Sequence, residues 1–166
     1  MRYSLFLIIL IIACAQNASV EVGINDGAIL NGTYGDISVH FTRIEIFQNG
    51  SYTDLWNGSN NVNFKINSEN FCSITMNYVP VPPGSYRKLR VTIDSLSYVE
   101  EGKKTVLLDS SYQFIASAFT DLIIEENGEY RFVINANTTT WFDPDSIKIK
   151  NGHQPFENAS LKLFYQ

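Results

Sequence analysis

Hydrophobic and polar positions alternate along most of the chain, most clearly in residues 37–47. Apolar residues occupy every second position up to Phe41 and again from Ile44 onward, so the apolar phase shifts by one position at Thr42 and Arg43. A period of two is typical of a β-strand with one buried face, and a phase shift within it indicates a β-bulge. The pattern therefore predicts one long, bulged strand.

Further short runs of alternating or continuous apolar residues follow, and turn residues separate them. No window keeps a helical period of 3.6 for more than two turns. Many short strands between frequent turns are typical of an antiparallel sandwich, so we expect an all-β fold. The other expected strands are residues 19–24, 52–56, 62–66, 72–79, 89–93, 96–100, 105–108, 112–118, 121–125, 129–135 and 161–165.

Glycine next to a polar residue marks the expected turns. Asn49 and Gly50 suit a type I′ hairpin turn, because both residue types tolerate positive φ. Residues 57–59 (NGS) predict another turn, and residues 101–104 predict a second hairpin.

Residues 79–86, with the sequence VPVPPGSY, are the most distinctive stretch of the chain. Proline lacks an amide donor and fixes φ, so we expect no regular structure over residues 80–84. We expect Pro83, Gly84 and Tyr86 to form a structural corner in which the glycine adopts positive φ. The tyrosine ring would be buried while its hydroxyl binds a backbone group of the turn.

This stretch, followed by a strand containing Leu89-Arg90-Val91, resembles the corner of transthyretin-like (prealbumin-like) β-sandwiches, which include carboxypeptidase-regulatory-like modules. The chain is more closely similar to an uncharacterised family of prokaryotic lipoproteins with one such domain. Members share an early strand like residues 37–47 and a late strand like residues 130–135. The resemblance covers most of the chain after the leader. It implies an antiparallel Greek-key sandwich and brings no established activity.

The first residues have the pattern of a secretory leader. A positively charged start precedes an apolar run at residues 5–12, which is too short to span a bilayer comfortably. Residues 11–14 (IIAC) resemble the lipobox of prokaryotic lipoproteins, which implies cleavage before Cys14 and acylation of its sulfur. Stable anchoring takes more than one acyl chain. An ordinary secretory leader, cut after Ala15 or Ala18, is the alternative.

The chain thus divides into a signal peptide (residues 1–13), a tether with the first strand (residues 14–34) and a β-sandwich domain (residues 35–166). We expect the protein in the cell envelope outside the cytoplasm, lipid-anchored to a membrane, and to the outer membrane where the host has one. The formal net charge is −5 and no basic run occurs, which argues against nucleic acid as a partner.

The sequence offers little for catalysis. With Cys14 acylated, Cys72 has no disulfide partner, and we interpret it as a small buried hydrophobe rather than a reactive thiol. We expect His40 on a solvated strand face and His153 in a loop. No Ser-His-Asp or Cys-His arrangement can be assembled, so we expect no enzymatic activity and no cofactor.

Two kinds of ligand remain as alternatives. Asp143 and Asp145 flank a proline and offer oxygen ligands for calcium, or they belong to a plain loop. Residues 137–142 followed by His153 are similar to the end of periplasmic copper-binding lipoproteins, so His40 and His153 are candidate metal ligands.

Aromatic side chains in or near turns suggest carbohydrate, because such rings stack on sugars. The candidates are Trp56, Trp141, Tyr52, Tyr112 and Phe142. Asn-x-Ser/Thr triplets, which are turn formers in bacteria and glycan sites in archaea or eukaryotes, occur at Asn17, Asn31, Asn49, Asn57, Asn137 and Asn158. The sequence as a whole predicts a lipid-anchored envelope protein with a binding or structural role, whose partner is a glycan or another envelope protein.

Overall fold

The computed structural model describes residues 16–32 and 34–166. In this part of the chain, nine strands form one mixed sheet in the order β3-β2-β6-β7-β11-β8-β1-β4, and β5 pairs with β1. The strands are β1 (Ala18–Asp26), β2 (Asp36–Gln48), β3 (Ser51–Lys65), β4 (Ser68–Ser73), β5 (Val79–Val81), β6 (Gly84–Glu100), β7 (Lys103–Ile124), β8 (Glu129–Asn135) and β11 (Ser160–Tyr165). The predicted all-β class is confirmed.

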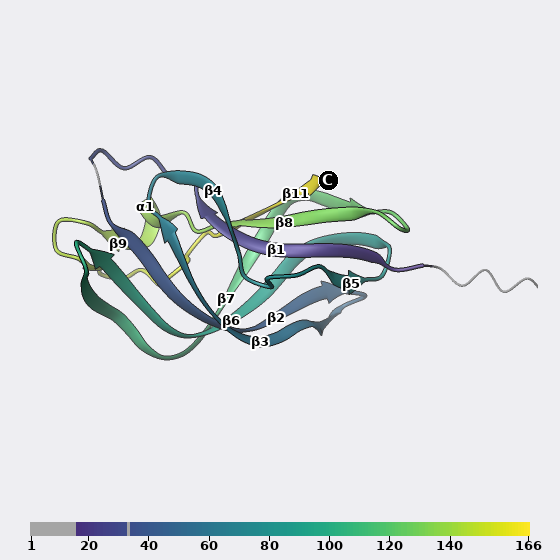
Figure 1. Cartoon of the computed structure of the whole chain (residues 1–166), viewed down its shortest axis with the longest axis horizontal. Coiled ribbons are helices and arrows are strands. Elements are labelled where there is room, and N and C mark those ends of the chain that lie inside the picture. The colour runs from purple at the N-terminus through teal and green to yellow at the C-terminus, as the bar shows by residue number, and fades with distance from the viewer. Residues whose placement is uncertain (1–15, 33) are drawn as a thin grey trace, which may run out of the picture.

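The sheet curls over on itself, so that β3, β2, β6 and β7 face β11, β8, β1 and β4 (Figure 1). Only the pair Ser117 and Ser160 joins β7 to β11. On the opposite side, the Asn60 side chain of β3 donates hydrogen bonds to the carbonyls of Ser73 (3.3 Å) and Ile74 (2.8 Å). The result is two layers built from one sheet. The first layer contains β3, β2, β6 and β7, and the second contains β11, β8, β1 and β4.

The sequence predicts a wholly antiparallel sheet, but the observed sheet is mixed. β1 pairs with β8 in parallel, and so does β7 with β11. A tight hairpin imposes antiparallel pairing only on strands that are neighbours in the sequence. Neither of these pairs is connected by a hairpin, so the sequence pattern carried no signal for their direction.

The inner faces of the two layers form a continuous core. In β1, Val20, Val22 and Ile24 are fully buried, and Phe132 and Ile134 of β8 are buried beside them. The facing layer supplies a matching set from β2 and β6: Ile37, Val39, Phe41, Ile44, Leu89, Val91, Ile93 and Leu96. These alternations are the period-two patterns visible in the sequence.

The connection from β8 to β11 covers one end of the long strands. It contains α1 (Thr138–Trp141), β9 (Phe142–Asp143) and β10 (Lys148–Ile149). Phe142 stacks on Tyr98 of β6 with ring centroids 5.4 Å apart, and Phe156 stacks on Phe114 of β7 at 4.3 Å. This segment therefore closes the core where the second layer ends. Among the described residues, no helix has the length and hydrophobicity to cross a membrane.

Both predicted hairpins are present. Asn49 (φ 51°) and Gly50 (φ 83°) join β2 to β3 with positive φ at both positions, as a type I′ turn requires. Glu101 (φ 50°) and Gly102 (φ 78°) join β6 to β7 in the same way, in a turn two residues shorter at its C-terminal side than expected.

Three strands are longer than expected, and one of them is β6, which joins the expected strands 89–93 and 96–100. The turn predicted at residues 57–59 is wrong, because β3 continues through these residues. Its pairing with β2 is irregular there, opposite the bulge that was predicted in β2 and that lies between Phe41 and Arg43. The Trp56 side chain lies over Gly58, where a Cβ would be 2.3 Å from the ring. Likewise, residues 112–118 and 121–125 are not separate strands but parts of β7, which ends at residue 124.

The expected strand over residues 72–79 is also wrong in its second half. β4 ends at Ser73, and Met76 adopts a φ of 61°. An unbroken strand would have placed Met76 and Tyr78 on the same face as Cys72, but both are exposed. The bend lets the chain follow the edge of β1, because the amides of Ile74 and Thr75 both donate to the Val22 carbonyl.

The proline-rich corner is partly regular. Contrary to expectation, Val79–Val81 forms β5, in which Pro80 lies opposite Ser19 of β1. A short strand at an edge tolerates proline, because its missing amide is not needed by a second neighbour. The corner itself is confirmed: Gly84 has a φ of 156°, and Tyr86 is buried while its hydroxyl donates to the Pro82 carbonyl at 2.6 Å.

We predict that Tyr86→Phe lowers the free energy of unfolding by about 1 kcal/mol, because it leaves the Pro82 carbonyl without its donor while keeping the ring. Urea unfolding followed by circular dichroism measures the change. Tyr78→Phe is the matched control, since the Tyr78 side chain is 40% exposed. Equal stability of Tyr86→Phe and the parent would contradict the claim that the Tyr86–Pro82 hydrogen bond stabilises the corner.

Candidate functional site

The leader and Cys14 lie outside the described residues, so the structure says nothing about them. Of the aromatic candidates, Trp141 and Phe142 are fully buried. The indole nitrogen of Trp141 donates to the Ala136 carbonyl at 2.9 Å. Both residues are core residues of the connection after β8, and their proposed role as sugar-stacking surfaces is wrong. The cause is packing: a loop that covers a core contributes its aromatic side chains to that core.

The other aromatic candidates are half-buried and make internal contacts. The ring of Tyr52 lies under the guanidinium of Arg90, with 4.2 Å between the guanidinium carbon and the ring centroid. The Tyr112 hydroxyl donates to the Pro155 carbonyl at 3.3 Å, and Trp56 lies over Gly58. The structure uses these rings in packing and does not gather them into one surface.

The candidate metal ligands are separated from one another. His153 Nδ1 lies 2.9 Å from Glu157, whereas His40 lies 3.4 Å from Asp94 and 2.9 Å from the Ser59 hydroxyl. No group of three or more histidine, cysteine, aspartate or glutamate side chains in residues 16–32 and 34–166 is placed to share a metal ion.

Asp143 stabilises a turn. Its carboxylate accepts hydrogen bonds from the Asp145 amide (3.1 Å) and from the Ser146 hydroxyl. The Ser146 bond is the main reason that the pKa of Asp143 lies below its ordinary value. Asp145 itself is exposed. The plain-loop interpretation fits these contacts better than a calcium site.

Cys72 is half-buried against the core, and its sulfur lies 3.8 Å from the Asn70 carbonyl. Burial raises the pKa of the Cys72 thiol. Since the thiolate is the reactive form, this environment disfavours a reactive thiol.

Several conspicuous charged groups are satisfied by their neighbours. On the outer face of the first layer, Arg90 donates to both carboxylate oxygens of the buried Glu45, each at 2.6 Å, and Arg43 lies 3.2 Å from it. These cations lower the pKa of Glu45, with the Arg90 hydrogen bonds as the largest cause. In the second layer, the buried Asp26 accepts from the Asn67 amide and from the amide and hydroxyl of Thr138. Such complete pairing is typical of structural polar groups.

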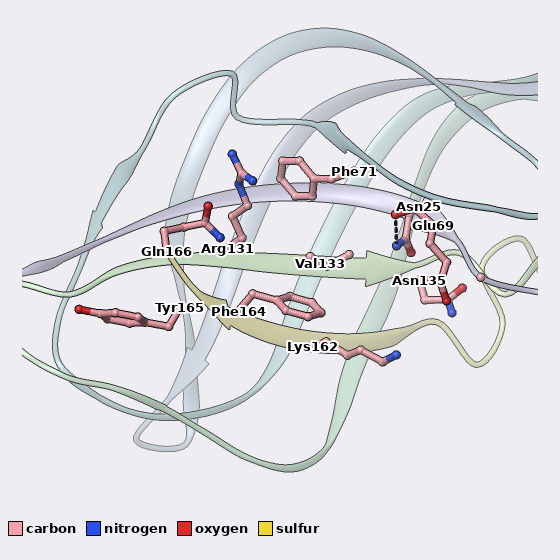
Figure 2. A pocket seen from close by; sticks show the side chains of 11 residues that line it. Asn25, Glu69, Phe71, Arg131, Val133, Asn135, Lys162, Phe164, Tyr165 and Gln166 are labelled. Carbon is pink, nitrogen blue, oxygen red and sulfur yellow. Dashed lines mark hydrogen bonds between the residues drawn. The ribbon is translucent and has the colours of Figure 1, made fainter.

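A groove on the outer face of the second layer is different. Strand alternation turns one set of residues of β1, β4, β8 and β11 away from the core and into a cavity of about 430 Å³. We call this the outer groove (Figure 2). It is lined by Asn25, Gly27, Glu69, Phe71, Arg131, Val133, Asn135, Lys162, Phe164, Tyr165 and Gln166.

A glycine in β1 shapes the wall of this groove. A Cβ on Gly23 would lie 2.3 Å from the Phe71 ring, so the glycine allows that ring to rest against the strand. The guanidinium carbon of Arg131 lies 4.9 Å from the Phe71 ring centroid, and its Nε donates to Glu21 at 2.9 Å. Phe71 and Arg131 are thereby fixed before any ligand binds.

The centre of the groove is apolar. Val133 points away from the core, between the inward Phe132 and Ile134, yet only 7% of it is exposed. Phe71 and Phe164 lie on either side of it (Figure 2), and 49% of Phe164 is exposed.

One end of the groove holds incompletely paired polar groups. Asn25 donates from Nδ2 to the Glu69 carbonyl at 3.1 Å, but its buried Oδ1 has no hydrogen-bond partner. It is the one such buried side-chain atom in the described part of the chain. Gly27 leaves room here for Glu69 and Asn135, whose side chains lie within 3.5 Å of where its Cβ would be. A buried acceptor without a partner costs free energy, and its position beside the cavity makes this end of the groove a candidate for ligand contact.

Sequence reasoning missed this groove. The outward positions of β8 and β11, such as Arg131 and Phe164, could be read from the alternation of residues 129–135 and 161–165. What could not be read was that β1 and β4 lie beside them, because that neighbourhood depends on pairing between distant strands.

The chain has no match among protein-family models, curated proteins or solved structures. Nothing in these comparisons tests the resemblance to the lipoprotein family or to transthyretin-like sandwiches, so both remain predictions. The groove is therefore interpreted from its own chemistry.

We predict that the Glu45 cluster makes stability depend on pH at the acidic end. A carboxylate whose folded pKa is lowered contributes stability that is complete above its unfolded pKa, near 4.5, and is lost as the pH falls through the folded pKa. The urea concentration at the unfolding midpoint of the parent should therefore decrease when the pH is lowered from 7 to 3. It should fall less in Glu45→Gln, which is already weakened at pH 7, than in the exposed control Glu126→Gln. An identical pH dependence in both variants would contradict this account.

Proposed function

We propose that the protein is a lipid-anchored, non-enzymatic binding protein of the cell envelope, and that the outer groove is its ligand-binding site. The observation that carries the binding role is the contrast between two kinds of polar group. The charged groups of Asp26 and Glu45 are fully paired within the fold, whereas the buried Oδ1 of Asn25 in the groove is not.

The composition of the groove supports binding rather than catalysis. Its lining residues include no histidine, cysteine, serine or threonine, and Glu69 is the one acidic side chain among them in the described structure. Hydrolysis of a glycosidic bond commonly uses a pair of carboxylates, and acyl transfer uses a nucleophile with a base. A single acid beside fixed aromatic and amide groups suits recognition.

The proposed anchor rests on the sequence alone. An apolar run of signal-peptide length ends at residues 11–14 (IIAC), and acyl chains on Cys14 would hold the protein at a membrane outside the cytoplasm. The described fold begins only a few residues later, because β1 starts at Ala18. The tether would therefore be short, and the domain would lie close to the bilayer surface.

We predict that Cys14 carries the acyl chains. When cells that make the full chain are fed labelled palmitate, the parent and Cys72→Ser should incorporate the label, and Cys14→Ala should lose essentially all of it. Mass spectrometry of the mature N-terminus should find an acylated cysteine. A mature protein that starts after Ala15 or Ala18, or label that persists in Cys14→Ala, would overturn the anchor.

A further inference from the structure

We infer that the ligand of the outer groove is a neutral saccharide of one or two pyranose rings. This inference rests on the proposed binding function and adds the chemical class of the ligand. It places the sugar ring on Phe164 and its hydroxyls toward Asn25, Glu69 and Lys162, none of which was a candidate from the sequence.

The first argument is an available aromatic surface on a rigid floor. Phe164 is half-exposed beside the nearly buried Val133, whereas Phe71 is already covered by Gly23 and Arg131. The apolar C–H face of a pyranose can therefore stack on Phe164, with Phe71 as a side wall. Asn25 and Glu69 line one end of the groove, and Arg131 and Gln166 line the other (Figure 2), so hydroxyls at the edge of the sugar ring meet hydrogen-bonding groups.

The second argument is the mixture of donors and acceptors. Sugar hydroxyls both donate and accept, and the groove offers both kinds of partner. Asn25 Oδ1 is a buried acceptor without a donor, and the Glu69 carboxylate takes part in no ion pair in the described structure. Lys162 and Arg131 supply donors. A hydroxyl that reaches the Asn25 amide would supply a donor to the one buried side-chain acceptor that is unpaired among the described residues.

The third argument is size and charge. A cavity of about 430 Å³ lies in the range of about 300–1,000 Å³ that is typical of small-ligand sites. Arg131 forms an ion pair with Glu21, and Lys162 and Glu69 both line the groove, so these four side chains together carry no net charge. Balanced charges favour a neutral ligand over an anionic or a strongly cationic one.

The test uses the full chain, labelled with ¹⁵N, in micelles of a detergent without a sugar headgroup. Cellobiose, maltose, lactose and N,N′-diacetylchitobiose are titrated separately while the amide resonances are followed. We expect at least one of them to shift the amides of Gly27, Lys162 and Phe164 with a dissociation constant of about 1 mM or tighter. The amides of Asn49 and Gly50, in the β2–β3 turn, should stay unchanged.

Substitutions of Phe164 test whether its ring contacts the sugar. Phe164→Ala should raise the dissociation constant of the sugar that binds most tightly about tenfold. Phe164→Tyr should bind this sugar as the parent does, because it keeps the aromatic surface. Phe119→Ala is the matched control, since Phe119 is fully exposed and lies outside the groove. Unchanged resonances elsewhere would show that Phe164→Ala is still folded.

A parallel titration with a detergent extract of the cell envelope separates the two proposals. If the extract shifts the groove amides and none of the sugars does, the saccharide inference is overturned and the binding function stands. If neither shifts them, or if sugars shift only residues outside the groove, both are overturned. Equal affinity of Phe164→Ala and the parent also overturns the inference.

Discussion

The parallel pairing of β1 with β8 is the interaction on which both the core and the groove depend. It sets Val20 beside Tyr130 and Asn25 beside Asn135, in an unbroken register of seven residue pairs. This register turns Val22 and Phe132 into the core and leaves their neighbours facing outward. Because side chains alternate along a strand, a slip of one residue would exchange the two faces of β1. The core and the groove are thus two sides of one register.

The two faces of β1 differ in whether their buried polar side chains are fully hydrogen-bonded. Next to the groove, Asp26 is buried and accepts three hydrogen bonds, which tie the end of β1 to α1 and to the turn before β4. Asn25, one residue earlier, faces the groove and keeps a buried oxygen unpaired. An unpaired buried polar group costs about 1–3 kcal/mol, and Asn25 Oδ1 is the one such side-chain atom in residues 16–32 and 34–166.

Glycine and arginine make the groove a preformed feature. Gly23 lets the Phe71 ring approach the strand, and Arg131 covers that ring while it donates to Glu21. Side chains held in this way lose little conformational entropy when a ligand binds, which favours affinity for a small partner. The exposed ring of Phe164 completes the surface.

Sequence patterns were informative where the relevant interactions are local. Alternation predicted the all-β class and the bulge of β2, and Asn49-Gly50 predicted its hairpin because the turn type follows from the residues that form it. The buried Tyr86 at the corner was predicted for the same reason.

Patterns failed where distant segments decide the outcome. Trp141 is equally compatible with a sugar site and with a core, and only the packing of its loop over β6 and β7 distinguishes the two. The Asn57-Gly58 pair resembles a turn, but the matching bulge of β2 keeps β3 paired through it. The groove needed the order of β4, β1, β8 and β11, which no local pattern contains.

The most direct test of this account is a measurement of the β1–β8 register by nuclear Overhauser effects between backbone protons in the ¹⁵N-labelled chain. The account predicts cross-peaks that connect the Gly23 region with Val133 and its immediate neighbours, in the parallel pattern. Cross-peaks shifted by one residue, or an antiparallel pattern, would contradict it, because Asn25 and Arg131 could not then share the groove.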